Sequence, residues 1–160
     1  MSPARPPVTA GLTIRPVEAE DLVRWLPLWN GYNAFYGRIG DTALPAEITQ
    51  TTWARFLDPA EPMYALVAQQ GDALVGLAHY LYHRNTTAIG PSCYMQDLFT
   101  SEAARGRGVG RALIERVYED ARSAGAGRVY WQTHQTNRTA MHLYDAVADL
   151  SEFRIYYKTL

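Results

Sequence analysis

Apolar residues recur along the chain with two spacings, one typical of strands and one typical of helices. From Leu12 to Val17 apolar and polar residues alternate, and Pro16 places this predicted first strand at a sheet edge, where a missing N–H is tolerated. Residues 18–36 carry apolar residues at three- and four-residue steps, which predicts a helix that Pro27 kinks or restarts. The stripe on this helix consists of Leu22, Trp25, Trp29, Tyr32 and Tyr36.

The middle of the chain is predicted to hold a second helix and three strands. The helix begins at Pro45, because proline suits the first turn of a helix, and Asp58-Pro59 ends it. Gln70-Gly71-Asp72 predicts a tight turn between the first two strands. The three strands are expected at residues 63–68, 73–83 and 93–100.

The last third of the chain returns to helical spacing. A helix is predicted over Val109–Ser123, and Gly125 and Gly127 end it. A short strand over 128–133, a helix over 137–147 and a closing strand over 153–158 are expected to follow. The order β-α-α-β-β-β-α-β-α-β predicts an α/β (mixed α+β) fold, in which a central mixed twisted sheet carries helices on both faces.

Length and composition limit the classes of function. The 160 residues suit a single domain over 12–160, and the three prolines within residues 1–11 predict a flexible leader. A net charge of -1 provides no overall field that would attract nucleic acid or an acidic membrane. No apolar run is long enough for a membrane span, and the first residues lack the apolar core of a signal peptide. We therefore expect a cytoplasmic protein.

Metal and thiol chemistry have little support in the sequence. Cys93 is the single cysteine, which excludes an internal disulfide framework and a multi-cysteine zinc site, and a lone strand cysteine is expected to be buried and inert. His79 and His83 fall on one face of a predicted strand, but no third ligand accompanies them. We expect a partly exposed histidine pair and no metal.

The densest chemical signal is a loop in which arginines and glycines alternate. Its glycines let the backbone approach a ligand, and the helix that starts inside the loop adds the positive end of its dipole. Its arginines supply charge-assisted donors for phosphate oxygens. We expect the loop to bind a pyrophosphate. It runs Arg105, Gly106, Arg107, Gly108, Val109, Gly110 and Arg111.

Two common nucleotide loops do not fit this stretch. The dinucleotide fingerprint needs glycine where Arg111 stands, and the P-loop needs a lysine, whereas the single lysine of the chain is Lys158. The pattern Arg/Gln-x-x-Gly-x-Gly/Ala does fit, and it resembles the acetyl-CoA loop of the GCN5-related (GNAT) N-acetyltransferases. The resemblance implies acetyl-CoA as co-substrate, an N-acetyltransferase activity and the GNAT fold.

A downstream helix carries the same resemblance. Asn137, Ala140 and Tyr144 lie on one helical face. In the family an asparagine at the start of this helix contacts the cofactor, and a tyrosine seven residues later protonates the departing thiolate. The resemblance therefore implies cofactor binding by Asn137 and general acid catalysis by Tyr144. The simpler interpretations are that Asn137 only caps the helix and that Tyr144 is an ordinary core tyrosine.

The strand before the loop resembles particular groups of enzymes within the GNAT family. Residues 89–100 are similar to the spermidine/spermine-type and thialysine-type enzymes, and residues 29–36 and 150–153 to yeast histone/polyamine acetyltransferases. The polyamine enzymes have a glutamate where Gln96 stands, and an amide cannot act as a base. Asp97 is therefore our first candidate for the general base, with Glu102 or an ordered water as alternatives. The resemblance further implies thioester binding by the backbone N–H groups of Leu98, Phe99 and Thr100.

Three functions stay open at this point. The leading one is acetyl transfer to a primary amine of a small molecule, polyamine or amino-acid-like. The aromatic stripe is expected to be mostly core, and the resemblance implies that its polar edges line the acceptor pocket. The alternatives are a protein or histone lysine acetyltransferase and a non-catalytic acetyl-CoA sensor. The resemblance and the apolar residues at 153–157 also imply a homodimer or higher homo-oligomer, without nucleic-acid or membrane partners.

Overall fold

Five strands form a single mixed sheet in the order β1-β2-β3-β4-β5. The structure is a computed structural model that describes residues 10–160, so the leader predicted for residues 1–11 lies almost wholly outside the described residues. Neighbouring strands from β1 to β4 run antiparallel, and β5 runs parallel to β4. Their bounds are β1 Leu12–Pro16, β2 Met63–Gln70, β3 Ala73–His83, β4 Ser92–Thr100 and β5 Arg128–Tyr130.

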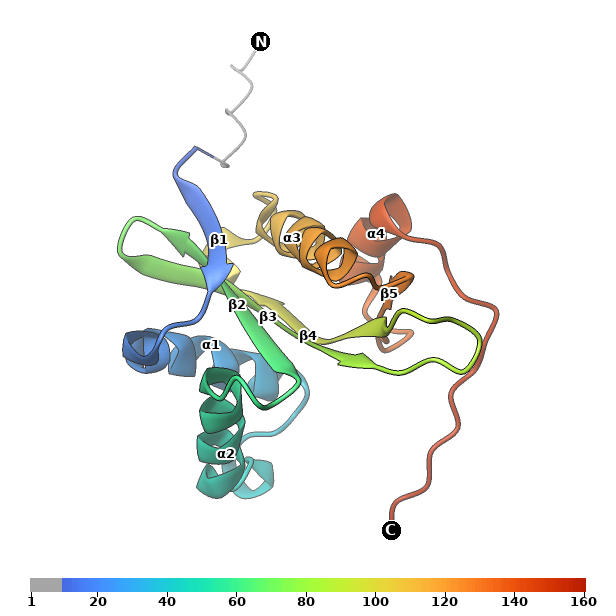
Figure 1. The fold of residues 1–160 in the computed structure, drawn as a ribbon. Coiled ribbons are helices and arrows are strands. Elements are labelled where there is room, and N and C mark those ends of the chain that lie inside the picture. The colour runs from blue at the N-terminus through green and yellow to red at the C-terminus, as the bar shows by residue number, and fades with distance from the viewer. Residues whose placement is uncertain (1–9) are drawn as a thin grey trace.

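Helices cover both faces of this sheet, as the sequence predicts. Figure 1 shows α1 and α2 together on one face and α3 and α4 on the other. The helices span α1 Leu22–Phe35, α2 Ala46–Leu57, α3 Val109–Ser123 and α4 Arg138–Val147, with 3-10 turns at Ala19–Asp21, Gly40–Thr42 and Glu102–Ala104. No helix within residues 10–160 is long and apolar enough to cross a membrane.

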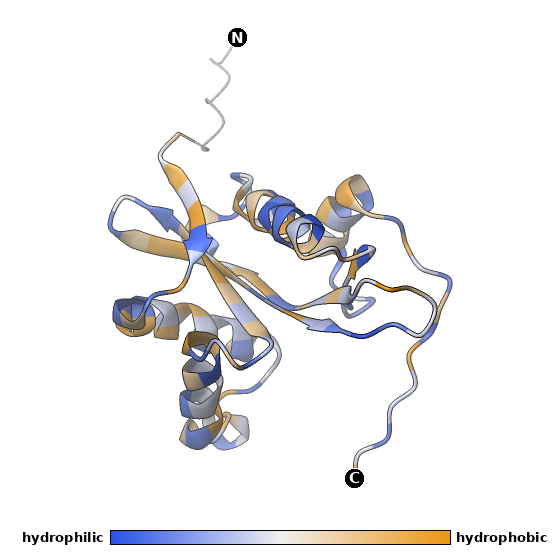
Figure 2. Cartoon of the chain, in the orientation of Figure 1, coloured by the Kyte–Doolittle hydropathy of each residue, from blue (hydrophilic) through white to orange (hydrophobic). Residues whose placement is uncertain are grey.

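The central strands separate two hydrophobic cores. Neighbouring residues of a strand point to opposite faces, so the continuous apolar stretches of β2 and β3 contribute side chains to both cores (Figure 2). Leu66 packs with the buried face of α3, whereas Val67, the next residue, packs with the tryptophans of α1. The aromatic stripe is largely core: Trp25 is 0%, Trp29 7% and Tyr32 8% exposed.

Helix α1 does not restart at its proline. It continues through Pro27 without a break. The proline removes a hydrogen bond to the carbonyl of Val23, and Val23 lies on the solvent side with 79% exposure, so water can replace the missing donor. Two boundaries also shift: Pro45 is the residue before α2 rather than its first member, and β5 ends at Tyr130 instead of reaching residue 133.

The predicted closing strand over residues 153–158 is wrong for this chain. Residues 148–160 form no strand and leave the domain as an extended segment (Figure 1). Phe153, Tyr156 and Tyr157 are each about 90% exposed or more. The alternation of apolar residues suits a strand, but no strand of the described chain pairs with them.

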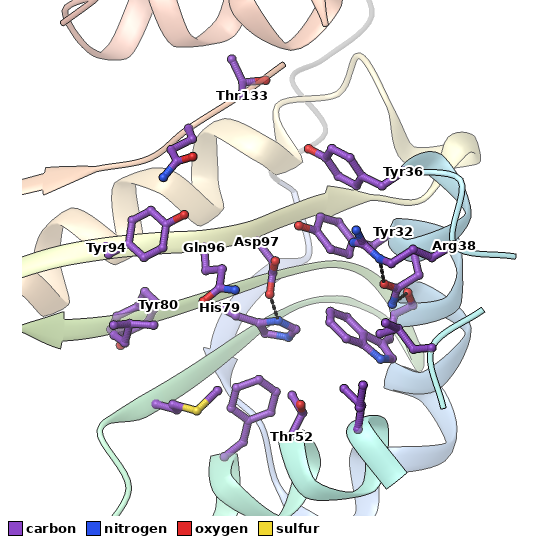
Figure 3. A pocket seen from close by; sticks show the side chains of 18 of the residues that line it. Tyr32, Tyr36, Arg38, Thr52, His79, Tyr80, Tyr94, Gln96, Asp97 and Thr133 are labelled. Atoms are coloured by element: carbon purple, nitrogen blue, oxygen red, sulfur yellow. Dashed lines mark hydrogen bonds and ion pairs between the residues drawn. The ribbon is translucent and has the colours of Figure 1, made fainter. Parts of the chain in front are cut away.

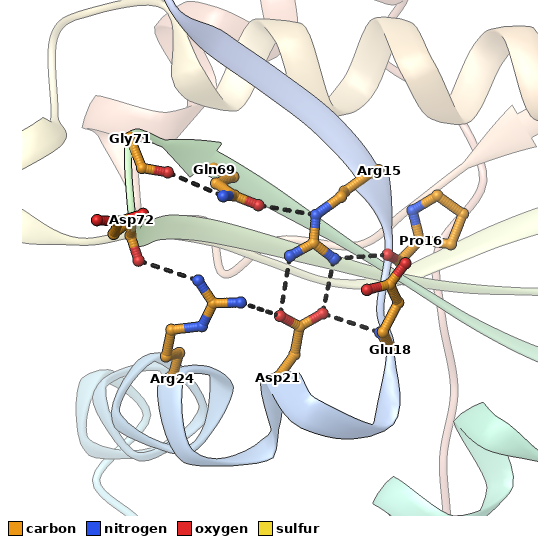
Figure 4. Close-up of polar contacts among 8 residues, drawn as sticks. All are labelled: Arg15, Pro16, Glu18, Asp21, Arg24, Gln69, Gly71 and Asp72. Atoms are coloured by element: carbon orange, nitrogen blue, oxygen red, sulfur yellow. Dashed lines mark hydrogen bonds and ion pairs between the residues drawn. The ribbon is translucent and has the colours of Figure 1, made fainter.

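A buried carboxylate anchors the start of α1 to the sheet (Figure 4). Arg15 on β1 donates two hydrogen bonds to Asp21, at 2.7 and 2.9 Å, and Arg24 on α1 donates a third at 2.6 Å. The Asp21 side chain is 1% exposed. The hydrogen bond from Arg15, followed by the backbone N–H of Glu18, lowers the pKa of Asp21 from 3.8 to about 2.

This anchor predicts an acid-sensitive stability. Asp21→Asn should lower the free energy of unfolding at neutral pH by about 2 kcal/mol, which is the free energy that corresponds to the lowered pKa of Asp21. In the parent protein that stabilisation is fully present above pH 3.8 and is lost as the pH falls toward 2, because the unfolded chain binds the proton first. Urea unfolding across this range measures both effects. Asp72→Asn is the matched control, because its exposed side chain makes no ion pair within residues 10–160, and equal effects of the two changes would contradict the prediction.

Candidate active site

Strands β4 and β5 part soon after they meet. Their pairing covers only Ser92–Tyr94 against Arg128–Tyr130. Beyond this point β4 stays paired with β3 alone, up to Thr100. Along Leu98–Thr100 the backbone groups that point toward β5 therefore have no partner strand in the described chain, which leaves N–H donors available to a ligand.

A bulge in β4 shapes the strand just before this opening. His79 of β3 pairs with Asp97, but Tyr80 pairs with Met95, so Gln96 is an extra residue. Neighbouring strand residues normally point to opposite faces. Here Gln96 and Asp97 both line the same pocket.

This pocket lies between the sheet and the helices α1 and α2 (Figure 3). Its volume is about 640 Å³, within the usual range for small-molecule sites. Aromatic side chains of α1 and β4 form its walls, and residues that follow β5 close one side. Its lining includes Trp29, Tyr32, Tyr36, Arg38, Thr52, Phe56, His79, Tyr80, Tyr94, Gln96, Asp97, Gln132, Thr133 and His134.

A chain of buried hydrogen bonds ends at Asp97. The Nδ1 atom of His79 lies 2.8 Å from Oδ2 of Asp97, and the indole N–H of Trp25 donates to Nε2 of His79 at 3.1 Å. An indole can only donate, so Nε2 must accept and the proton of the neutral imidazole sits on Nδ1. His79 therefore donates to Asp97 and holds the carboxylate in one orientation.

The side chain of Asp97 remains partly accessible within the pocket that it lines. Its side chain is 11% exposed. Burial, followed by the nearby Asp97 carboxylate, raises the pKa of Tyr32, so this phenol stays protonated. Asp97 is the one carboxylate among the described lining residues, and the alternative base Glu102 lies outside the lining.

The arginine–glycine loop lies at the start of α3. Gly108 is the N-cap residue of α3 with φ of +84°, a conformation that favours glycine, and a Cβ there would meet nothing within 4 Å. Arg105, Arg107 and Arg111 form no ion pair within residues 10–160. The loop thus offers backbone donors, a helix N-terminus and free positive charge, the combination that binds phosphates.

Two predicted loop residues contribute differently. The Val109 side chain is 3% exposed and packs in the core, which leaves only its backbone for a ligand. A Cβ on Gly110 would lie 3.2 Å from Leu143, so this glycine lets α3 and α4 approach closely.

Helix α4 brings its two predicted residues to the same side as the loop. Asn137 is the N-cap residue, but its side chain makes no capping bond and instead donates to Thr133 at 3.3 Å. The ring of Tyr144 packs edge-on against Trp131, with 5.3 Å between centroids. Burial, with Tyr36 as a smaller cause, raises the pKa of Tyr144 to about 12, so its proton is retained at neutral pH.

Of the remaining sequence candidates, Cys93 and His83 lie outside the pocket lining. Cys93 is fully buried, and burial raises its pKa to about 12, so it packs as an inert thiol. The expected partly exposed histidine pair is wrong for His79, which is 3% exposed, whereas His83 is exposed and bonded to Tyr130 at 2.7 Å. The described residues contain no cluster of three potential metal ligands.

Sequence reasoning missed His79 and Arg38 as members of the site. A polar histidine within an apolar strand was the available signal for His79, but its pairing with Asp97 requires the register of β3 and β4. Arg38 follows α1 directly, and only the fold shows that its side chain lines the pocket.

The opening between β4 and β5 thus lies between a loop suited to phosphates and a pocket of small-molecule size. The chain belongs to the acetyltransferase (GNAT) family, whose model matches residues 25–148. This membership makes the protein an N-acetyltransferase and confirms the predicted fold.

Relatives from curated proteins agree with the family. The chain is 38% identical over 148 residues to the D-amino-acid N-acetyltransferase HPA3 of Saccharomyces cerevisiae, covering 91% of this chain and 89% of the relative. It is 33% identical over 95 residues to the thialysine N-epsilon-acetyltransferase of Bos taurus, covering 58% and 55% of the two chains.

Solved structures share the fold at lower identity. The aminoglycoside N-acetyltransferase AAC(6')-Iy in complex with CoA has a TM-score of 0.78 at 18% identity, over 92% of this chain and 94% of that chain. An aminoglycoside acetyltransferase from an uncultured soil sample has a TM-score of 0.77 at 20% identity, over 96% and 99%.

Proposed function

We propose that this protein transfers the acetyl group of acetyl-CoA to a primary amine of a small molecule bound in the 640 Å³ pocket. The observation that carries the proposal is the position of Asp97, a lone carboxylate held toward the pocket beside the opening between β4 and β5. An amine can reach this carboxylate from one face while the loop on the other face holds the co-substrate.

The residues of the loop fit the pyrophosphate of CoA. The guanidinium groups of Arg105, Arg107 and Arg111 and the first N–H groups of α3 would hold its phosphates. Asn137 at the start of α4 would hold the arm that leads to the thioester. The N–H groups along Leu98–Thr100 would stabilise the negative charge that develops on the thioester oxygen. Bound in this way, acetyl-CoA supplies the activated acetyl group.

Proton transfers complete the reaction. A primary amine has a pKa of about 10.4 and is therefore protonated at neutral pH, so it must lose a proton before it attacks. Asp97 takes that proton, directly or through a water, and His79 keeps the carboxylate in place. The amine nitrogen bonds to the carbonyl carbon, the carbon–sulfur bond breaks, and the nitrogen releases a second proton. Tyr144 protonates the departing sulfur and regains a proton from the two that the nitrogen has released, so one proton leaves to solvent overall.

Two further features of the proposal come from the relatives and the sequence. The D-amino-acid and thialysine acetyltransferases support a small amine as acceptor rather than a histone tail. The cytoplasmic location expected from the sequence stays a prediction.

The loop assignment predicts a specific loss of CoA binding. Gly108→Asp should abolish the CoA signal in calorimetry, because a side chain and a negative charge would meet the phosphates. Gly71→Asp is the matched control: its φ is also positive, at +60°, and it lies in the β2–β3 turn. If folded Gly108→Asp protein binds CoA as tightly as the control, the loop does not hold the co-substrate.

Tyr144→Phe tests the proposed general acid. The change keeps the ring packed on Trp131 and removes only the donor. Free-thiol release should fall by about 100- to 10,000-fold, while CoA affinity barely changes. Tyr118→Phe, which loses a hydroxyl bonded to the carbonyl of Val147, controls for a general effect of a lost phenol. Unchanged turnover in Tyr144→Phe would reject the assignment, and intact CoA binding with no turnover in the parent protein would favour the sensor alternative.

We also propose that the extended C-terminal segment pairs with a second copy of the chain. Leu150, Phe153 and Tyr157 are 84–90% exposed, and an extended segment with this much exposed apolar surface is stabilised when a partner covers it. Exchange of such a segment is a simple route to a homodimer.

The dimer has a direct test. Sedimentation of the full chain at micromolar concentration should give twice the 18.0 kDa mass of one chain. Phe153→Glu combined with Ile155→Glu should return it to one chain, whereas Val23→Glu, on the exposed side of α1, should not. A parent protein that sediments as a single chain would rule out the dimer.

A further inference from the structure

The pocket carries one fixed charge of each sign. Among its described lining residues Asp97 is the one carboxylate, and Arg38 is the one arginine or lysine. The two do not neutralise each other, because the side chain of Asp97 is bonded to the neutral imidazole of His79 and no ion pair joins it to Arg38 within the described residues. The pocket is thus complementary to a molecule that carries both an ammonium and a carboxylate.

The guanidinium of Arg38 is held in place at the end of α1. Its backbone N–H bonds to the carbonyl of Asn33 at 2.9 Å, and its Nε bonds to Oδ1 of the same residue at 2.7 Å. Its Cζ lies 5.7 Å from the ring centre of Tyr32 and 5.3 Å from that of Tyr36. Figure 3 shows Arg38 beside the Tyr32 ring. The side chain is therefore oriented before a ligand arrives.

The rest of this guanidinium is available for binding. Nε makes the one side-chain hydrogen bond of Arg38 in the described part of the chain, and no carboxylate lies within 4.0 Å. The two terminal nitrogens form a planar fork that matches the two oxygens of a carboxylate. Half-burial beside two aromatic rings strengthens such a contact relative to open water.

We propose that Arg38 selects an amino acid as the acceptor, the class named for the relative from Saccharomyces cerevisiae, by binding its carboxylate while the reacting amine faces Asp97. This inference rests on the proposed acetyl transfer and names its substrate class. A polyamine fits the same pocket poorly, because its second ammonium would find no further carboxylate and would approach the positive charge of Arg38.

Matched substrates that differ only in the carboxylate test this role. L-lysine and 1,5-diaminopentane form one pair, and phenylalanine of either hand with 2-phenylethylamine forms another. Free-thiol release from acetyl-CoA gives kcat/KM for each. Arg38→Met keeps the aliphatic stem and removes the fork, and it should lower kcat/KM for the amino acids by about 10- to 100-fold, mainly through KM. The decarboxylated amines should change by less than about 3-fold.

The outcomes separate the inference from the function on which it rests. Arg122→Met, on the exposed side of α3, is the control and should leave every rate unchanged. If Arg38→Met slows the amino acids and the decarboxylated amines equally, Arg38 only supports the pocket walls and the inference is wrong, while acetyl transfer stands. If the parent protein releases no thiol with any of these amines, the proposed function itself fails.

Discussion

The parting of β4 from β5 is the constraint on which the rest of the site depends. Pairing stops at Tyr94 and Tyr130, and the gap between the two strands beyond this point connects the two faces of the sheet. It frees backbone donors along Leu98–Thr100 and lets the pocket extend to residues after β5. A continuous sheet would separate the amine from the thioester.

Buried polar contacts set the chemistry of that opening. Trp25 fixes the tautomer of His79, and His79 in turn orients Asp97, so three elements far apart in sequence converge on one carboxylate. The bulge at Gln96 turns the strand so that this carboxylate faces the pocket. The Asp21 anchor contributes from outside the site, because it holds α1 and its aromatic wall on the sheet.

Local sequence patterns predict much of the fold and part of the site. Features that depend on contacts between distant residues could not be predicted from them. The helix over Val109–Ser123 and its glycine loop follow from spacing and turn chemistry, and the structure has that helix with the same bounds. The bond between His79 and Asp97 needs the strand register, which no local signal contains. The alternation at residues 153–158 is typical of a strand, but it cannot say that residues 10–160 offer this segment no partner strand.

The central claim is that Asp97 accepts the proton of the amine, and the pH dependence of Asp97→Asn tests it most directly. Asparagine keeps the shape and cannot accept a proton. Thiol release with an amine acceptor should fall by about 100-fold or more near neutral pH. The deficit should shrink as the pH approaches about 10, where the amine loses its proton unaided. A variant that matches the parent protein at neutral pH, or a deficit that stays constant at every pH, would contradict the account.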